Sequence, residues 1–141
     1  MSDNDYFPMV PSFEDTTKYR LLTNDYVETI EVDGREILKI DPEGIALLTA
    51  QGFSDTSHLL RTEHLEQVRK ILDDPEASDN DRFVALDMLK NANISSGRVL
   101  PMCQDTGTAI IMGKKGEQVW VDGNDEAAIS EGVKRTYETD N

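Results

Sequence analysis

The chain has 141 residues, of which 38% are hydrophobic and 30% charged, enough for one soluble domain with its own core. Twenty-eight acidic residues against 14 basic ones give a formal charge of −14, which argues against binding to nucleic acid or to an anionic membrane. A single cysteine excludes an internal disulfide, and no membrane-length apolar run, signal peptide or transit peptide is found, so we expect a cytoplasmic protein.

The first predicted elements are an extended arm and a β-hairpin. Residues 1–18 hold two prolines and three aromatic residues among acids, which favours an arm lying along a surface. We therefore place a single domain in residues 19–141. The runs from Val27 to Val32 and from Arg35 to Ile40 are rich in β-forming residues and are joined by Asp33-Gly34, a strong turn signal. They predict an antiparallel hairpin with a structural role only.

Three helices are predicted next, each from its capping residues. Asp41 caps the first helix, which we expect to end at Gly52. Thr62 caps the second helix, whose apolar residues recur at helical spacing. Ser78 begins the third with a capping-box pattern, and this helix is expected to end near Asn93.

The sequence has two histidines and a nearby arginine that could serve a binding or catalytic site. His58 and His64 lie six residues apart, a spacing that does not place them on one helix face as a metal-binding pair. We expect His64 to be solvent-exposed in a first helical turn. For His58, a hydrogen-bonded structural role is favoured over a role in a site. Arg61 is kept as a candidate partner for a carboxylate.

The segment from Val99 to Gly113 concentrates polar residues that suit a site. Cys103 is the only cysteine of the chain, and Gln104 and Asp105 follow it directly. The run from Thr108 to Met112 is short, apolar and rich in β-branched residues, which predicts a buried strand. The polar residues thus lie on a loop that enters a strand, where binding residues are common.

The residue types alone leave two interpretations of this loop open. In the first, which burial statistics favour, Cys103 is a small buried apolar residue and Asp105 satisfies the amides of a turn. In the second, the Cys103 thiolate is one ligand of a metal centre whose other ligands lie elsewhere, with Gln104 and Asp105 facing the same pocket. A lone cysteine fits no structural zinc site, because such sites need four ligands.

The last predicted elements complete a sheet and add a helix. Residues 118–121 are expected to pair with 108–112 as a second hairpin. Asp122 and the acids that follow it begin the last helix, where they complement the helix dipole. The buried stripe of this helix comprises Ile129, Val133 and Tyr137. The expected fold class is α+β, with an antiparallel sheet built from two hairpins and covered by several helices.

The sequence also resembles a known enzyme family. The run from Leu100 to Ile111 closely resembles the segment around the first cluster cysteine of class I, iron–sulfur fumarate hydratases. The stretches 19–22, 54–61, 74–78 and 125–128 resemble the same family, in the same order. The resemblance covers nearly the whole chain, which looks like the N-terminal domain of a longer enzyme.

This resemblance implies reversible hydration of fumarate to malate. In the family, three cysteines hold a four-iron four-sulfur cluster, and one iron acts as a Lewis acid on the substrate. Cys103 matches the first of these metal ligands. Gln104 and Asp105 match the substrate-binding residues just after it, and Asp105 also has a catalytic role. The other two cysteines, the arginines that hold the dicarboxylate and the proton-accepting group have no counterpart here. We therefore expect the isolated chain to be inactive and to hold no cluster alone.

The expected partners follow from the same resemblance. They are fumarate and malate, the remainder of the same polypeptide, and a second copy in a full-length homodimer, with no nucleic acid and no membrane. Two alternatives stay open: the same chemistry on tartrate or a methylated dicarboxylate, or a non-catalytic acidic interaction module. A reading frame that continues past Asn141 with two more cysteines would favour the enzyme, and a stop codon would favour the module.

Overall fold

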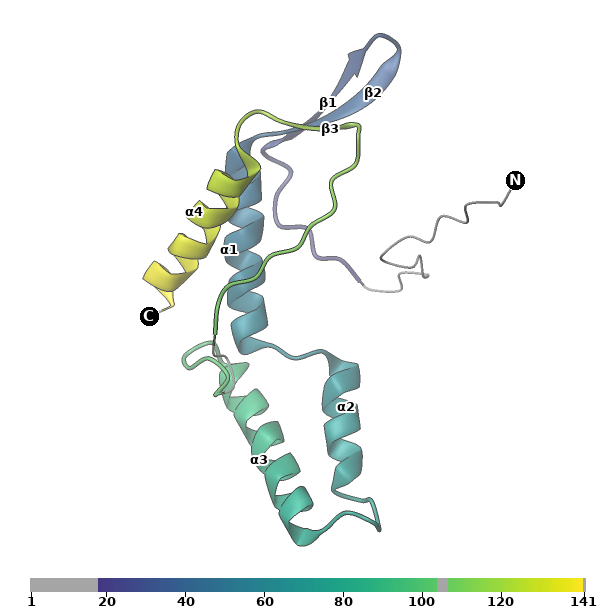
Figure 1. Cartoon of the computed structure of the whole chain (residues 1–141), viewed down its shortest axis with the longest axis vertical. Coiled ribbons are helices and arrows are strands. Elements are labelled where there is room, and N and C mark those ends of the chain that lie inside the picture. The colour runs from purple at the N-terminus through teal and green to yellow at the C-terminus, as the bar shows by residue number, and fades with distance from the viewer. Residues whose placement is uncertain (1–17, 104–106, 141) are drawn as a thin grey trace, which may run out of the picture.

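The computed structural model describes residues 18–103 and 107–140 (Figure 1). The elements in these residues are β1 (Val27–Val32), β2 (Arg35–Ile40), α1 (Pro42–His58), α2 (Thr62–Ile71), α3 (Asp79–Ser95), β3 (Val119–Val121) and α4 (Asp125–Thr139). Helices combined with a small sheet confirm the predicted α+β class. The predicted arm, apart from its last residue, lies outside the described residues, and so do Gln104 and Asp105.

The first hairpin forms as predicted. Strands β1 and β2 pair antiparallel, with Ile30 opposite Ile37. Asp33 and Gly34 both have positive φ, at 50° and 75°. Two positive φ values are what the tightest hairpin turn requires, and glycine adopts them without a steric penalty. The turn signal in the sequence therefore fixed the register of the two strands.

The second hairpin was predicted wrongly. Strand β3 pairs in parallel with β2, with Lys39 opposite Trp120, so the sheet is mixed and its order is β1-β2-β3. Residues 108–112 form no strand, and Ile110 and Met112 are 78% and 93% exposed. The stretch before β3 returns from the far end of α1 to the sheet (Figure 1). That long return brings β3 in alongside β2 in the same direction, as a parallel pair requires.

Helix α1 is longer than predicted. It continues through Gly52 to His58, and its last turn closes where the Leu59 N–H donates to the Asp55 carbonyl at 2.8 Å. A glycine ends a helix by adopting positive φ, and Gly52 does not adopt it. The predicted start is confirmed, because the Asp41 carboxylate accepts a hydrogen bond from the Glu43 N–H at 2.8 Å.

Helices α1 and α4 pack closely along their length. A Cβ atom on Gly132 would lie 2.5 Å from the Ala46 carbonyl oxygen, so only glycine permits this approach. The Thr136 hydroxyl donates to the Ala50 carbonyl at 3.0 Å, which joins the two backbones directly. Arg135 also donates to the Glu43 carboxylate, and this hydrogen bond lowers the pKa of Glu43 below its ordinary value.

The helices pack in pairs rather than over the sheet, which differs from the predicted arrangement. Helix α1 packs on α4 and α2 on α3, while the β1-β2 hairpin projects beyond one end of α1 (Figure 1). The predicted capping box at Ser78 is confirmed, with reciprocal hydrogen bonds to Asp81. No helix in the described part of the chain is long and apolar enough to cross a membrane.

Much apolar surface is left in contact with solvent. The most deeply buried apolar side chains are mostly small, including Ala46, Ala85 and Ala128. Large apolar side chains that are at least 60% exposed include Tyr19, Leu21, Leu48, Phe83, Val99, Leu100, Ile110 and Met112. Exposed apolar surface of this extent is typical of a protein part that other polypeptide segments cover.

Candidate functional site

The loop that carries Cys103 is attached to two helices through backbone hydrogen bonds. The Met102 N–H donates to the carbonyl of Ser57, at the end of α1, over 2.9 Å. The Cys103 N–H donates to the Asn91 side-chain oxygen on α3, over 3.0 Å. The Met102 side chain is only 9% exposed and serves as the apolar anchor of this attachment. Ser57 and Asn91 thus hold the backbone of the only cysteine.

The Cys103 side chain is exposed and forms no disulfide. The interpretation of Cys103 as a small buried core residue was therefore wrong, although burial statistics favoured it. Burial statistics describe an average cysteine. In this chain the preceding residue, Met102, is buried, whereas Cys103 is exposed. An exposed thiol on a fixed backbone is available to an external partner, such as a metal centre.

His58 is buried and hydrogen-bonded, as the structural role favoured by the sequence requires. Its side chain is 3% exposed, and Nδ1 lies 2.8 Å from the Ser54 carbonyl oxygen. Because a carbonyl only accepts, Nδ1 carries the hydrogen and donates it. The buried Ser95 hydroxyl donates to the His58 carbonyl at 3.0 Å and so ties α3 to the end of α1. His64 is exposed, as expected, and so is Arg61, whose predicted role stays untested.

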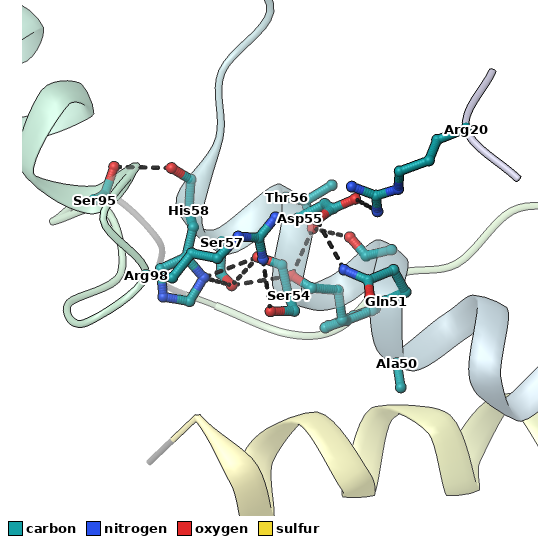
Figure 2. A network of polar contacts seen from close by, with 12 residues as sticks. Arg20, Ala50, Gln51, Ser54, Asp55, Thr56, Ser57, His58, Ser95 and Arg98 are labelled. Atoms are coloured by element: carbon teal, nitrogen blue, oxygen red, sulfur yellow. Dashed lines mark hydrogen bonds and ion pairs between the residues drawn. The ribbon is translucent and has the colours of Figure 1, made fainter. Parts of the chain in front are cut away.

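A network centred on Asp55 lies beside this attachment (Figure 2). Arg20 donates to Asp55 Oδ2 at 2.7 Å, and Gln51 donates to Oδ1 at 3.0 Å. Arg98 Nη2 also donates to Oδ1, while Arg98 Nη1 donates to the Ser54 hydroxyl at 3.2 Å. One carboxylate near the end of α1 therefore binds arginines from two distant parts of the sequence.

The two arginines keep Asp55 ionised. Partial burial of the carboxyl group raises the pKa of Asp55. The hydrogen bonds from Arg98 and Gln51 and the charges of Arg20 and Arg98 outweigh this effect, so that the pKa lies below its ordinary value. The ion pairs therefore persist from neutral pH down to the ordinary pKa of an aspartate and weaken only in stronger acid.

A cavity of about 360 Å³ lies between the ends of α1 and α4 and the residues from Gly107 to Ile110. Its lining includes Phe53, Ser57, His58, Pro101, Thr108 and Tyr137. The volume suits a small molecule. The described lining includes neither lysine nor arginine, so a dianion bound there would need cations from elsewhere.

The described residues supply one suitable ligand for an iron–sulfur cluster but not a complete set. Within residues 18–103 and 107–140, no group of three His, Cys, Asp or Glu side chains is close enough to hold a metal ion. Cys103 is a soft donor that suits iron–sulfur chemistry, and its exposure lets it serve as one corner ligand. The predicted substrate residues Gln104 and Asp105 lie outside the described residues, so their positions are untested.

Comparison with known protein families shows which family the chain belongs to. The family profile described as "Fumarate hydratase (Fumerase)" matches residues 47–141, which include the Cys103 loop and all of α2, α3 and α4. The chain belongs to the fumarate hydratase family. This match confirms the resemblance predicted from the sequence.

Individual relatives extend the match toward the N-terminus. "Fumarate hydratase 1, mitochondrial" of Leishmania major is 58% identical over 127 residues, which are 89% of this chain and 23% of that protein. "Fumarate hydratase class I, anaerobic" of Escherichia coli K12 is 54% identical over 131 residues, which are 93% of this chain and 24% of that protein. The chain thus spans about a quarter of the length of these fumarate hydratases.

Proposed function

We propose that this chain is the N-terminal domain of a class I fumarate hydratase, a hydro-lyase that interconverts fumarate and malate. The observation that carries the proposal is identity above half over 93% of the chain with a protein named as a class I enzyme. The exposed thiol of Cys103 on a backbone held by two helices supports it, because a cluster ligand needs access and a fixed position.

In this proposal Cys103 supplies one thiolate to a four-iron four-sulfur cluster. When bound, the cluster supplies a Lewis acid that polarises the substrate's hydroxyl and carboxylate oxygens. Ser57 and Asn91 accept hydrogen bonds from the Met102 and Cys103 amides and so fix the backbone that leads into the ligand. The Gln104 amide would bind a substrate carboxylate, and Asp105 would orient the substrate hydroxyl or a partner histidine.

The remaining parts of the site would come from the rest of the polypeptide. The chain has one cysteine, so two further cluster ligands must lie elsewhere. The exposed apolar residues on the described surface give that remainder a face to cover. We infer that the chain alone is inactive and holds no stable cluster, and that the full-length enzyme is a homodimer. A cytoplasmic location stays a prediction.

The substrate is tested by comparing dicarboxylates on the full-length enzyme under anaerobic conditions. We expect fumarate and malate to interconvert, with tartrate and a methylated fumarate turned over at least about tenfold more slowly in kcat/KM, as one misfitting group commonly costs. The readout is the loss of fumarate absorbance together with chromatography of the products. Faster turnover of tartrate or the methylated acid would establish the alternative substrate, and no turnover of any of them would favour the interaction module.

A further inference from the structure

The Asp55 network joins segments that are far apart in the sequence. Arg20 precedes the sheet, Gln51 and Asp55 belong to α1, and Arg98 follows α3. The Asp55 side chain is 30% exposed, so its ion pairs are partly shielded from water. A carboxylate that receives hydrogen bonds from two guanidinium groups holds both more strongly than a single surface pair does.

Arg98 has an unusual backbone conformation. Its φ is +58°, in the left-handed region that residues with a Cβ atom seldom adopt. Such a conformation persists where surrounding contacts impose it. Here the Arg98 N–H donates to the Ser95 carbonyl at 2.9 Å and closes the end of α3, and the guanidinium group adds bonds to Ser54 and Asp55. The backbone and the side chain of Arg98 together hold the chain where it leaves α3.

The residues between Arg98 and the cysteine loop have little packing of their own. Val99 is 83% exposed and Leu100 is 60% exposed, so neither side chain fixes this stretch in the described structure. The next attachment is the backbone of Met102 on Ser57, followed by that of Cys103 on Asn91. The approach to Cys103 is therefore held at one end by Arg98 and at the other by these two hydrogen bonds.

We propose that Asp55 is a positioning residue that holds the Cys103 loop in place through Arg98. The carboxylate acts on the last turn of α1, which also carries the Ser57 carbonyl that binds Met102. The end of α1 therefore provides two attachments of this stretch, at Arg98 and Met102, and Asn91 on α3 provides the third, at Cys103. The consequence for the cluster rests on the proposed function, since it requires Cys103 to be a ligand.

The test measures amide hydrogen exchange by mass spectrometry in the full-length protein after its metal has been removed by a chelator. Asp55→Asn keeps the side-chain shape but removes the charge, and Arg98→Asn keeps a residue that tolerates positive φ. In both variants we expect the amides of Met102 and Cys103 to exchange about tenfold faster or more, because a charge-assisted anchor is lost. The rate at which the Cys103 thiol is alkylated should also change in these two variants.

Two further variants make the result specific. Asp73→Asn breaks an ion pair of the same length, 2.7 Å to Arg69 on α2, and should leave the Cys103 loop unchanged. Asp55→Glu keeps the charge and should restore part of the protection. Unchanged exchange in both Asp55→Asn and Arg98→Asn would overturn the proposal. Faster exchange over the whole chain, including the β1-β2 hairpin, would also overturn it, because Asp55 would then support the fold in general.

Cluster content separates this proposal from the proposed function. With the cluster loaded anaerobically, Asp55→Asn should lose iron faster in air and show a lower kcat with little change in KM for fumarate. Faster exchange at Met102 and Cys103 with undisturbed iron content would leave the positioning role standing. The proposed function would instead be contradicted by undisturbed iron content in Cys103→Ser.

Discussion

Replacing Cys103 by serine in the full-length enzyme is expected to abolish fumarate hydration while the domain stays folded. Serine has nearly the same size, but its hydroxyl is a poor ligand for iron in a sulfur cluster. Because the thiol is exposed in this chain, the substitution should change the free energy of unfolding of the cluster-free protein by less than about 0.5 kcal/mol. Iron and sulfide content, visible absorbance and thermal unfolding measure the three effects.

Asp105→Asn, two residues along the same loop, is the matched comparison for Cys103→Ser. Asparagine caps a turn as well as aspartate does, so a purely structural role predicts nearly unchanged turnover. The proposed role predicts a full cluster with turnover reduced by roughly a hundredfold or more. Normal iron content and normal activity in Cys103→Ser would remove the cysteine from the site, whatever Asp105→Asn shows.

The second large effect is expected at the contact between α1 and α4. Gly132→Ala would place a Cβ atom 2.5 Å from the Ala46 carbonyl oxygen and 2.6 Å from the Thr49 Cβ atom. Both atoms belong to or adjoin the α1 backbone, so the helices must separate and the bond between Thr136 and Ala50 must lengthen. We expect a loss of about 1–3 kcal/mol in the free energy of unfolding, the usual cost of overpacking.

Gly52→Ala provides the control for this substitution. Gly52 also lies inside a helix, but an added Cβ atom there would meet nothing within 4 Å. Alanine favours a helix over glycine by about 1 kcal/mol, so this variant should be slightly more stable than the parent chain. Urea unfolding followed by circular dichroism compares the two variants. Equal stability of Gly132→Ala and Gly52→Ala would mean that α1 and α4 do not pack in this way.

Several parts of the fold that depend on neighbouring residues were predictable from the sequence, although the predicted cap at Thr62 was wrong because Arg61 is the N-cap of α2. The Asp33-Gly34 turn needs only two adjacent residues with positive φ, and the cap at Asp41 needs only the next turn of helix. Both predictions are confirmed. The end of α1 was missed because a glycine ends a helix only when its φ is positive. The residues around Gly52 do not reveal that its φ stays negative.

The parts that depend on distant residues were not predictable. The apolar run from 108 to 112 looks like a strand locally, but its residues form the return path to a parallel β3. Arg98 and Asp55 are 43 residues apart, and no local pattern links them. The exposure of Cys103 likewise depends on Met102 taking the buried place beside α1.

The central claim is that this chain contributes a cluster ligand to a fumarate hydratase, and iron-dependent malate formation tests it most directly. Full-length enzyme is stripped of iron anaerobically, reloaded in steps with iron and sulfide, and assayed with fumarate after each step. We predict that malate formation rises in proportion to cluster content and that Cys103→Ser stays at background throughout. Malate formation that persists in the stripped enzyme, or full recovery by Cys103→Ser, would contradict this account.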